Sequence, residues 1–398
     1  MDFVSLEEVK AMLIAGKTYR CISEELKALY PQKRGFSERS VRRFVAKRNL
    51  KKICCHEKLY IVNQSIREVG SLYGRKMMKG YLASKGASIS ERDLKKHLPL
   101  LSPQWHSARH QSSSERSNPL IYTSHYFGHK LHVDQNEKLV QYGVTYVLAR
   151  DGYSGKIVGQ AIMAVKNNAI IYEHVYRTCT LEYGLWDEIR VDHGKEFYLL
   201  LYMHEQLRKE GRGNPDVSPY LQTSSTANHI IERIWVEVNQ RVTYPIKRVI
   251  IIMDDCRLIN MENSVDKYCV SVVLRRICMV GLQRMINAWN SHSVPRKGIP
   301  NVLQSQNNGT TPMDPADVPS VDNAVAAYRE QGGSLTDPHE FGSDPLIDDA
   351  TLLQQREDDW LGRCASTEEV YTQLMCNDSQ PLQNSILHYI EITKNLSN

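Results

Sequence analysis

The chain has 398 residues, of which 41% are hydrophobic, and this length exceeds one compact core and predicts two or three domains. No apolar run is long enough to span a membrane, and no basic segment followed by an apolar core opens the chain, so we expect neither a membrane segment nor a signal peptide. The net charge of +5 is modest, and the nine scattered cysteines, an odd number without a CxxC pair, indicate a reducing compartment.

Positive and negative charges are separated along the chain. Residues 1–110 carry 23 Lys and Arg against 10 Asp and Glu, whereas residues 314–398 carry 4 against 16. A basic head of this kind suggests a polyanionic partner. The acidic C-terminal region, residues 301–398, is predicted to be partly irregular and to face solvent or a protein partner rather than nucleic acid.

Residues 1–53 are predicted to form a helix-turn-helix unit. Apolar residues at helical spacing mark helices at Leu6–Ile14 and Tyr19–Tyr30, and Ser37 is a good N-cap for a third helix that ends near Asn49. The outward side of this third helix carries basic residues, as in a helix that reads DNA. They are Arg39, Arg42, Arg43, Lys47 and Arg48.

Residues 54–106 are predicted to form a second helix-turn-helix unit. Its helices are Tyr73–Ser84 and Glu91–His97, with Ser88 or Ser90 as the N-cap of the latter. The basic residues again concentrate on the last helix, so we interpret the head as an all-α tandem helix-turn-helix region that binds DNA. They are Arg92, Lys95 and Lys96. The alternative is a helical bundle whose basic faces are only solvated.

A polar, serine-rich linker is predicted at residues 107–124, and strands follow it. Alternating patterns predict strands at His129–Gln135, Tyr142–Ala149 and Lys156–Ala164, and Asp151-Gly152 is a strong hairpin signal between the last two. Helices and strands then alternate along the chain. They are a helix at Asn168–Tyr183, a strand at Glu188–Val191, a helix at Glu196–Arg208, a strand at Val217–Gln222 and a helix from Thr226 to about Val242.

Three antiparallel strands followed by alternating helices and strands is the order of an RNase H-like domain. We therefore predict an α/β RNase H-like core, a mixed five-stranded sheet with flanking helices, over residues 125–300. A long apolar helix at Val270–Trp289 is expected to pack on this core. Residues 301–350 are expected to be loop-like, and short helices are predicted at Leu352–Trp360 and Thr367–Cys376.

Three acidic residues stand at ordered positions in this pattern. Asp134 lies on the first strand, Asp192 directly after the fourth, and Glu232 on the helix after the fifth. Two strand carboxylates and one helix carboxylate can converge into a cage for hard divalent cations. Each residue alone is better explained as a turn former or a solvated side chain, and the ordered trio is what favours a metal site. Glu137 and Glu196 are expected beside this site rather than on the metal.

The segments around these acids resemble the integrase core family, which comprises retroviral integrases and related DDE transposases. The resemblance covers roughly residues 125–300, and its last two segments resemble a transposon-type branch. The segments are His132-Val133-Asp134, Arg190-Val191-Asp192-His193-Gly194, Asn228–Trp235 and Trp289-Asn290-Ser291-His292. The head lacks the paired His and paired Cys of the retroviral zinc domain, so no structural zinc is expected there.

The resemblance implies a DNA recombinase that cleaves DNA and transfers strands by in-line transesterification at phosphorus. It implies two Mg²⁺ or Mn²⁺ ions held by Asp134, Asp192 and Glu232, and no nucleotide cofactor. Arg233 would contact a DNA phosphate. The implied partners are element ends, target DNA and further copies of the chain, and the substrate implies a nuclear location.

Two other interpretations remain open at this point. The chain can be a domesticated DNA-binding protein that keeps the fold without turnover, or an RNase H-like nuclease or resolvase that cleaves DNA without joining it. All three acids are in place, which is compatible with an active enzyme but does not establish activity. Metal-dependent strand transfer that vanishes in Asp134→Asn distinguishes the recombinase from both.

Overall fold

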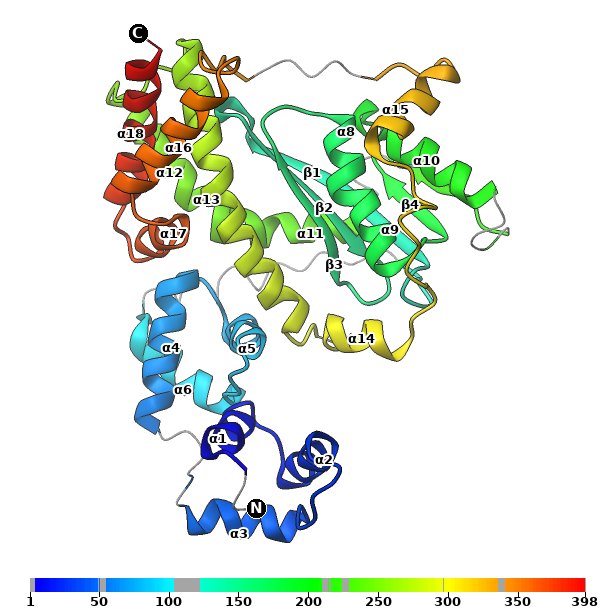
Figure 1. Ribbon diagram of the computed structural model, residues 1–398, viewed down its shortest axis with the longest axis vertical. Helices are drawn as coiled ribbons and strands as arrows, with labels where there is room; N and C mark the ends of the chain where they lie inside the picture. Colours follow the sequence, from blue (N-terminus) through cyan, green and yellow to red (C-terminus); the bar gives the residue numbers. More distant parts are fainter. Residues whose placement is uncertain are drawn as a thin grey trace.

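The computed structural model describes residues 4–48, 50, 55–103, 122–209, 214, 216–223, 229–295, 297–335 and 341–397. The basic N-terminal helices lie at one end of the long axis, and the sheet lies toward the other end beside the C-terminal helices (Figure 1). Among the described helices, none combines the length and the apolarity needed to cross a bilayer.

A mixed five-stranded sheet with the strand order β3-β2-β1-β4-β5 forms the centre of the fold. Strands β1 (Lys130–Leu139), β2 (Val144–Asp151) and β3 (Ile157–Met163) form an antiparallel meander. Strand β4 (Glu188–Val191) pairs parallel to β1, and β5 (Tyr220–Gln222) pairs parallel to β4. The predicted α/β core with a mixed five-stranded sheet is confirmed.

Both faces of the sheet are covered, which is why every residue of β2 is buried. On one face, Val147 and Ala149 pack into a core that the helices after β3 and β4 complete. These helices are α8 (Asn168–Ile171), α9 (Thr178–Tyr183) and α10 (Tyr198–Lys209), with a π-helical turn at Tyr172–Arg177 between the first two and a 3-10 turn at Lys195–Phe197 before the third.

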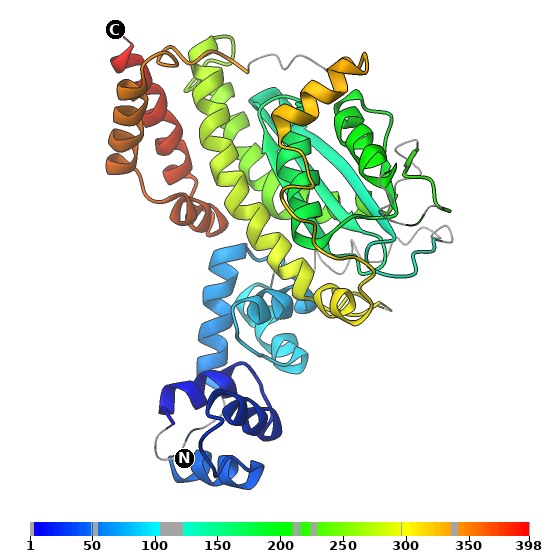
Figure 2. The same cartoon turned by 45° about the vertical axis from the view of Figure 1, so that its right-hand side comes forward.

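On the other face, Tyr146 and Leu148 pack against helices that follow β5. Helix α11 (His229–Val238) continues through a π-helical segment, Asn239–Thr243, into α12 (Tyr244–Asp255). The long helix α13 (Ser264–Ser291) runs diagonally past the sheet toward the N-terminal helices (Figure 2). Both helices predicted for this region are present; α13 is longer than predicted, and the helical course of α11 continues past the predicted end near Val242 into α12.

The N-terminal region is entirely helical in its described residues. The first unit contains α1 (Leu6–Ile14), α2 (Tyr19–Leu29) and α3 (Glu38–Lys47), close to the predicted bounds. The second unit contains α5 (Arg75–Ser84) and α6 (Glu91–Leu101), as predicted, and also a helix before them that was not predicted. This helix, α4 (Cys55–Val69), buries Val62, Ile66 and Val69 at helical spacing.

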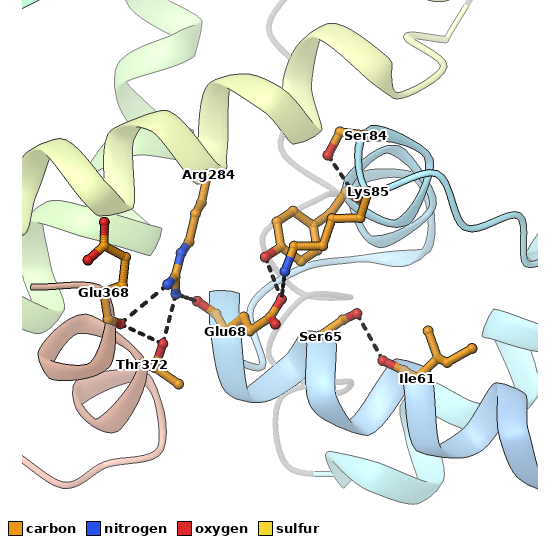
Figure 3. Close-up of polar contacts among 9 residues, drawn as sticks. Ile61, Ser65, Glu68, Ser84, Lys85, Arg284, Glu368 and Thr372 are labelled. Atoms are coloured by element: carbon orange, nitrogen blue, oxygen red, sulfur yellow. Dashed lines mark hydrogen bonds and ion pairs between the residues drawn. The ribbon is translucent and has the colours of Figure 1, made fainter. Parts of the chain in front are cut away.

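Helix α13 fastens the second N-terminal unit to the core. Helix α5 crosses α13 closely, since a β-carbon added at Gly80 would lie 2.4 Å from the carbonyl oxygen of Ala288. Beside this crossing, Arg284 of α13 donates hydrogen bonds to the carbonyl oxygen of Glu68 (2.6 Å) at the end of α4 and to Thr372 Oγ1 (3.0 Å) (Figure 3). One guanidinium therefore links the head, the core and the C-terminal region.

The C-terminal region is more helical than predicted. Helices α14 (Pro300–Gln306) and α15 (Val321–Glu330) lie within the range that was expected to be loop-like. Helices α16 (Ala350–Arg363) and α17 (Thr367–Met375) correspond to the two predicted short helices, whereas α18 (Gln380–Leu396) was not predicted. The last three pack together against α13, so this acidic region forms part of the folded body (Figure 1).

Candidate functional site

The parallel pairing of β1 with β4 aligns Asp134 with Asp192. The register pairs Lys130 with Glu188 and His132 with Arg190, so Asp134 and Asp192 each lie two residues beyond the last pair. Asp192 directly follows β4, and its Oδ1 accepts a hydrogen bond from the backbone N–H of Gly194 (2.9 Å). The turn that ends the strand therefore also holds the Asp192 carboxylate.

Helix α11 brings Glu232 and Trp235 to the same place. Trp235 Nε1 donates a hydrogen bond to Asp134 Oδ2 (2.8 Å), and the backbone N–H of Gln135 donates to Asp134 Oδ1 (2.9 Å). Glu232 precedes Trp235 by three residues and therefore shares its side of the helix. The buried side chains of Ile231 and Ile234 anchor α11 in the core.

The three carboxylates are electrostatically coupled. Burial raises the pKa of Asp134 to about 6; the hydrogen bonds from Trp235 and Gln135 oppose this rise, and the negative charges of Asp192 and Glu232 add to it. Like charges raise the pKa of a carboxyl group in this way only from nearby. The strand register and the hydrogen bond between Trp235 and Asp134 place the three acids near the same end of β1, and these charge effects agree with that placement.

The raised pKa of Asp134 predicts a pH-dependent stability. Because the folded-state pKa lies above that of the unfolded chain, ionisation of Asp134 costs stability, and the cost develops as the pH rises from about 4 through 6. A shift of about two pKa units corresponds to a loss of roughly 3 kcal/mol of folding stability when Asp134 ionises, and Asp134→Asn avoids this loss. Asparagine has only one side-chain oxygen, so the variant also loses one of the two hydrogen bonds, which offsets about 1 kcal/mol of the gain.

We therefore expect Asp134→Asn to unfold at the same temperature as wild type or higher at pH 7.5 in a chelator, and to lose this advantage at pH 4.5. Thermal unfolding by circular dichroism at both pH values measures the difference. A variant that is less stable than wild type at pH 7.5 and equal to it at pH 4.5 would contradict the sign of the shift.

The donor set fits a hard divalent cation in its chemistry. Mg²⁺ and Mn²⁺ prefer carboxylate oxygens, and none of the three acids forms an ion pair with a lysine, arginine or histidine whose placement is described. At the same time, over the described part of the chain, no group of three or more His, Cys, Asp or Glu side chains lies close enough together to hold a metal ion. The acids form a coupled cluster and not a closed coordination sphere.

The predicted DNA-binding residues lie at the surface, and all of them except Arg233 lie on elements other than those of the acids. Arg233, next to Glu232 on α11, has an exposed side chain. The eight basic residues of the head are exposed on or next to α3 and α6. They are Arg39, Arg42, Arg43, Lys47, Arg48, Arg92, Lys95 and Lys96. By contrast, Arg241, on the continuation of α11, is buried in an ion pair with Glu237 and stacks on the ring of Tyr73, so it does not face solvent.

Two residues at this site, Trp235 and Lys166, were not predicted from the sequence. Trp235 was not predicted to belong to the site. Its position three residues after Glu232, on the same face of a predicted helix, is a sequence signal that could have identified it. Lys166 was also missed, and its Nζ lies 2.8 Å from Glu137 Oε1 and 3.2 Å from Glu196 Oε1. Glu137 and Glu196 were expected beside the metal ligands, and both form ion pairs with Lys166.

The sequence of the chain matches a known family model. Residues 121–304 match the family model described as integrase core domain, a range that encloses the predicted core at residues 125–300 and includes all three acids. No curated protein matches the sequence of the chain.

Proposed function

We propose that this chain, whose residues 121–304 match the integrase core domain, is a recombinase of the integrase and DDE transposase type that cleaves DNA and transfers strands. The observation that carries the proposal is the placement of three acids inside that domain: Asp134 and Asp192 lie at matching positions on or next to paired parallel strands, and Trp235, one helical turn after Glu232, donates to Asp134 Oδ2. The negative charges of Asp192 and Glu232, which raise the pKa of Asp134, agree with this placement.

Asp134, Asp192 and Glu232 would hold Mg²⁺ or Mn²⁺. When bound, a pair of such ions activates the attacking oxygen and stabilises the leaving oxygen of an in-line displacement at phosphorus. The chain's own contribution is to position the ligands: Asp134 on β1 under the Trp235 indole, Asp192 in the Gly194 turn, and Glu232 on α11. No nucleotide cofactor is required.

The indole of Trp235 is expected to act as a positioning group for Asp134. Trp235→Phe keeps an aromatic ring in place but removes the N–H that donates to Asp134 Oδ2. Loss of a hydrogen bond to a metal ligand typically costs roughly 10–100-fold in metal affinity or activity, so we expect a loss of strand transfer in that range. Joining rates across a Mn²⁺ titration measure it, and the neighbouring surface change Val236→Ala serves as the control. An unchanged titration would show that the indole has no such role.

The basic head would supply DNA recognition. We propose helix-turn-helix units at residues 1–53 and 54–106, a linker at 107–124, the catalytic core at 125–300 and an acidic C-terminal region at 301–398. The exposed basic side chains near α3 and α6 support this division of labour, because phosphate contacts need accessible cations. Arg233 would contact phosphate beside the catalytic acids.

Arg43→Ala is expected to weaken DNA binding and to reduce the slope of log affinity against log salt by about 1. Arg43 is preferable to Arg42, whose guanidinium pairs with Glu38 at 3.0 Å. Fluorescence anisotropy over a salt series measures both quantities. The control is Arg363→Ala, which removes an exposed arginine from α16. If Arg43→Ala and the control give the same affinity and slope, the head does not bind DNA through α3.

The proposed reaction also implies an assembly and a location. Joining two element ends requires copies of the chain that hold both ends, so we propose a homo-oligomer on DNA, measurable by light scattering with end-containing duplexes. A nuclear location follows from the DNA substrate. Cleavage without joining would favour the nuclease interpretation, and DNA binding without any product would favour the domesticated binding protein.

A further inference from the structure

A cluster of polar side chains links the two segments that carry Asp134 and Asp192. Gln135 and Glu137 lie on β1 directly after Asp134, and Glu196 lies four residues after Asp192. Lys166 comes from a third segment, between the end of β3 and the start of α8. The cluster thus joins three stretches of chain that are distant in sequence.

Lys166 is the centre of this cluster. Its ammonium group lies 2.8 Å from Glu137 Oε1 and 3.2 Å from Glu196 Oε1. The amide of Gln135 donates to Glu137 Oε1 (3.1 Å) and also to Glu196 Oε1. Nearby, Asn168 Nδ2 donates to the carbonyl oxygen of Lys195 (2.8 Å), a second link between the segment of Lys166 and the segment that follows Asp192.

The ion pair between Lys166 and Glu196 matters for the fold because the side chain of Glu196 is buried. The side chain of Glu196 is only 6% exposed, whereas those of Lys166 and Glu137 are each 42% exposed. A buried carboxylate is costly unless it is paired and hydrogen-bonded, and Lys166 is the one cation that pairs with Glu196 among the described residues. The position of Glu196 therefore depends on Lys166.

Glu196 in turn packs against the turn of Asp192. A β-carbon added at Gly194 would lie 2.6 Å from the carboxyl carbon of Glu196, so the carboxylate folds directly over this glycine. The N–H of the same glycine donates to Asp192 Oδ1. Contacts therefore run from Lys166 through Glu196 and Gly194 to Asp192 on one side, and through Glu137 and Gln135 to Asp134 on the other.

We propose that Lys166 is a positioning residue that sets the separation of Asp134 and Asp192 by clamping Glu137 and Glu196. The role deepens the proposed strand transfer and rests on that function. Glu137 and Glu196 are engaged by the lysine and are not metal ligands. Removal of the lysine charge weakens the link between the Asp192 turn and β1, which the Gln135 amide then makes alone through Glu196, and leaves Asp134, Asp192 and Glu232 chemically intact.

The test compares Lys166→Met, Lys166→Arg and the control Lys209→Met in the full chain. Lys209→Met removes an exposed lysine whose ion pair, at 3.1 Å, is with Glu205 on α10 and not with Glu137 or Glu196. For Lys166→Met we expect a roughly 10–100-fold lower joining rate at saturating DNA. Mn²⁺ raises the unfolding temperature when it binds, and we expect this variant to need a higher Mn²⁺ concentration to reach half of that rise. Lys166→Arg restores both to within about fivefold of wild type, and Lys209→Met changes neither.

The double variant Lys166→Met/Glu196→Gln separates positioning from folding. It removes the uncompensated buried charge, so we expect its unfolding temperature in a chelator to return toward wild type while its joining rate stays low. Three results would overturn the proposal: wild-type joining and Mn²⁺ response in Lys166→Met, a loss confined to DNA affinity and its salt slope, or full recovery of joining in the double variant. A wild-type protein that joins no verified ends contradicts the proposed function itself and this role with it.

Discussion

Asp134→Asn, Asp192→Asn and Glu232→Gln are each expected to lower the rate of strand transfer by on the order of 10³-fold or more, with the fold retained. Each change removes one anionic oxygen ligand and leaves a side chain of nearly the same size. The loss of any one ligand disables the cation site as a whole, so the three effects do not add. A double variant such as Asp134→Asn/Glu232→Gln is expected to be no slower than the slower single variant.

Single-turnover joining of pre-cleaved ends in Mg²⁺ measures these rates, and circular dichroism and DNA affinity check the fold. Glu262→Gln is the matched control, because Glu262 is an exposed acid in the turn before α13. If any of the three variants keeps more than about a tenth of the wild-type rate, that residue does not hold the catalytic ion. Additive losses in the double variant would show that the acids act separately.

Asp344→Asn is expected to lower the free energy of unfolding by about 3–5 kcal/mol, the second large effect. Arg356 of α16 donates to both Asp344 oxygens, at 2.7 and 2.8 Å, and the two side chains are 3% and 5% exposed. The guanidinium also lies over the rings of Tyr268 and Tyr389, which join α16 to α13 and α18. The asparagine leaves a buried cation without its counter-charge, which weakens the packing of the C-terminal helices on α13.

Chemical denaturation monitored by tryptophan fluorescence is a suitable measurement, because Trp360 is buried in this cluster. The control lies on the same helix: Arg363 forms an exposed pair with Glu391 at 3.8 Å, and Arg363→Met is expected to cost less than about 1 kcal/mol. The double change Asp344→Leu/Arg356→Met removes both charges and is expected to recover much of the loss. Equal costs for Asp344→Asn and Arg363→Met would contradict the buried-pair argument.

Local signals were sufficient to predict much of the core from the sequence. The strand Glu188–Val191 was predicted to the residue, because its Ile and Val lie between Gly184 and the His193-Gly194 break. Strand β1 was predicted too short, since the polar run Asn136-Glu137-Lys138 interrupts the apolar alternation. Asn136 and Leu139 still pair with β2, Glu137 and Lys138 lie at the register shift between them, and Leu139 rejoins the core. Tertiary pairing overrides the local pattern there.

Helix α18, which was not predicted, shows a different limit. Helix α18 has apolar residues at helical spacing, among them Leu382, Ile386 and Tyr389, but Asn, Ser and Gln around them weaken the pattern. Its stability comes from packing against α13 and α16, as expected for helices whose intrinsic propensity is moderate. Composition alone suggested an irregular acidic tail.

The candidate site divides in the same way. Asp134, Asp192 and Glu232 stand out because their order relative to predicted strands and helices is a sequence property. The contacts of Trp235 with Asp134 and of Lys166 with Glu196 are not visible in the sequence, because the folded sheet brings together residues that are 101 and 30 positions apart. Periodicity carries no information about such pairs, so only the assembled structure reveals the groups that position the acids.

The central claim is that Asp134, Asp192 and Glu232 form one metal-dependent site for strand transfer. Its most direct test incubates wild type and Asp134→Asn side by side with the DNA ends that flank the gene, in Mg²⁺ or Mn²⁺ and in a chelator. Joined products from wild type with metal, and from no other reaction, are the predicted result. Binding of verified ends by both proteins without products from either would contradict the claim and identify the chain as a DNA-binding protein that has lost turnover.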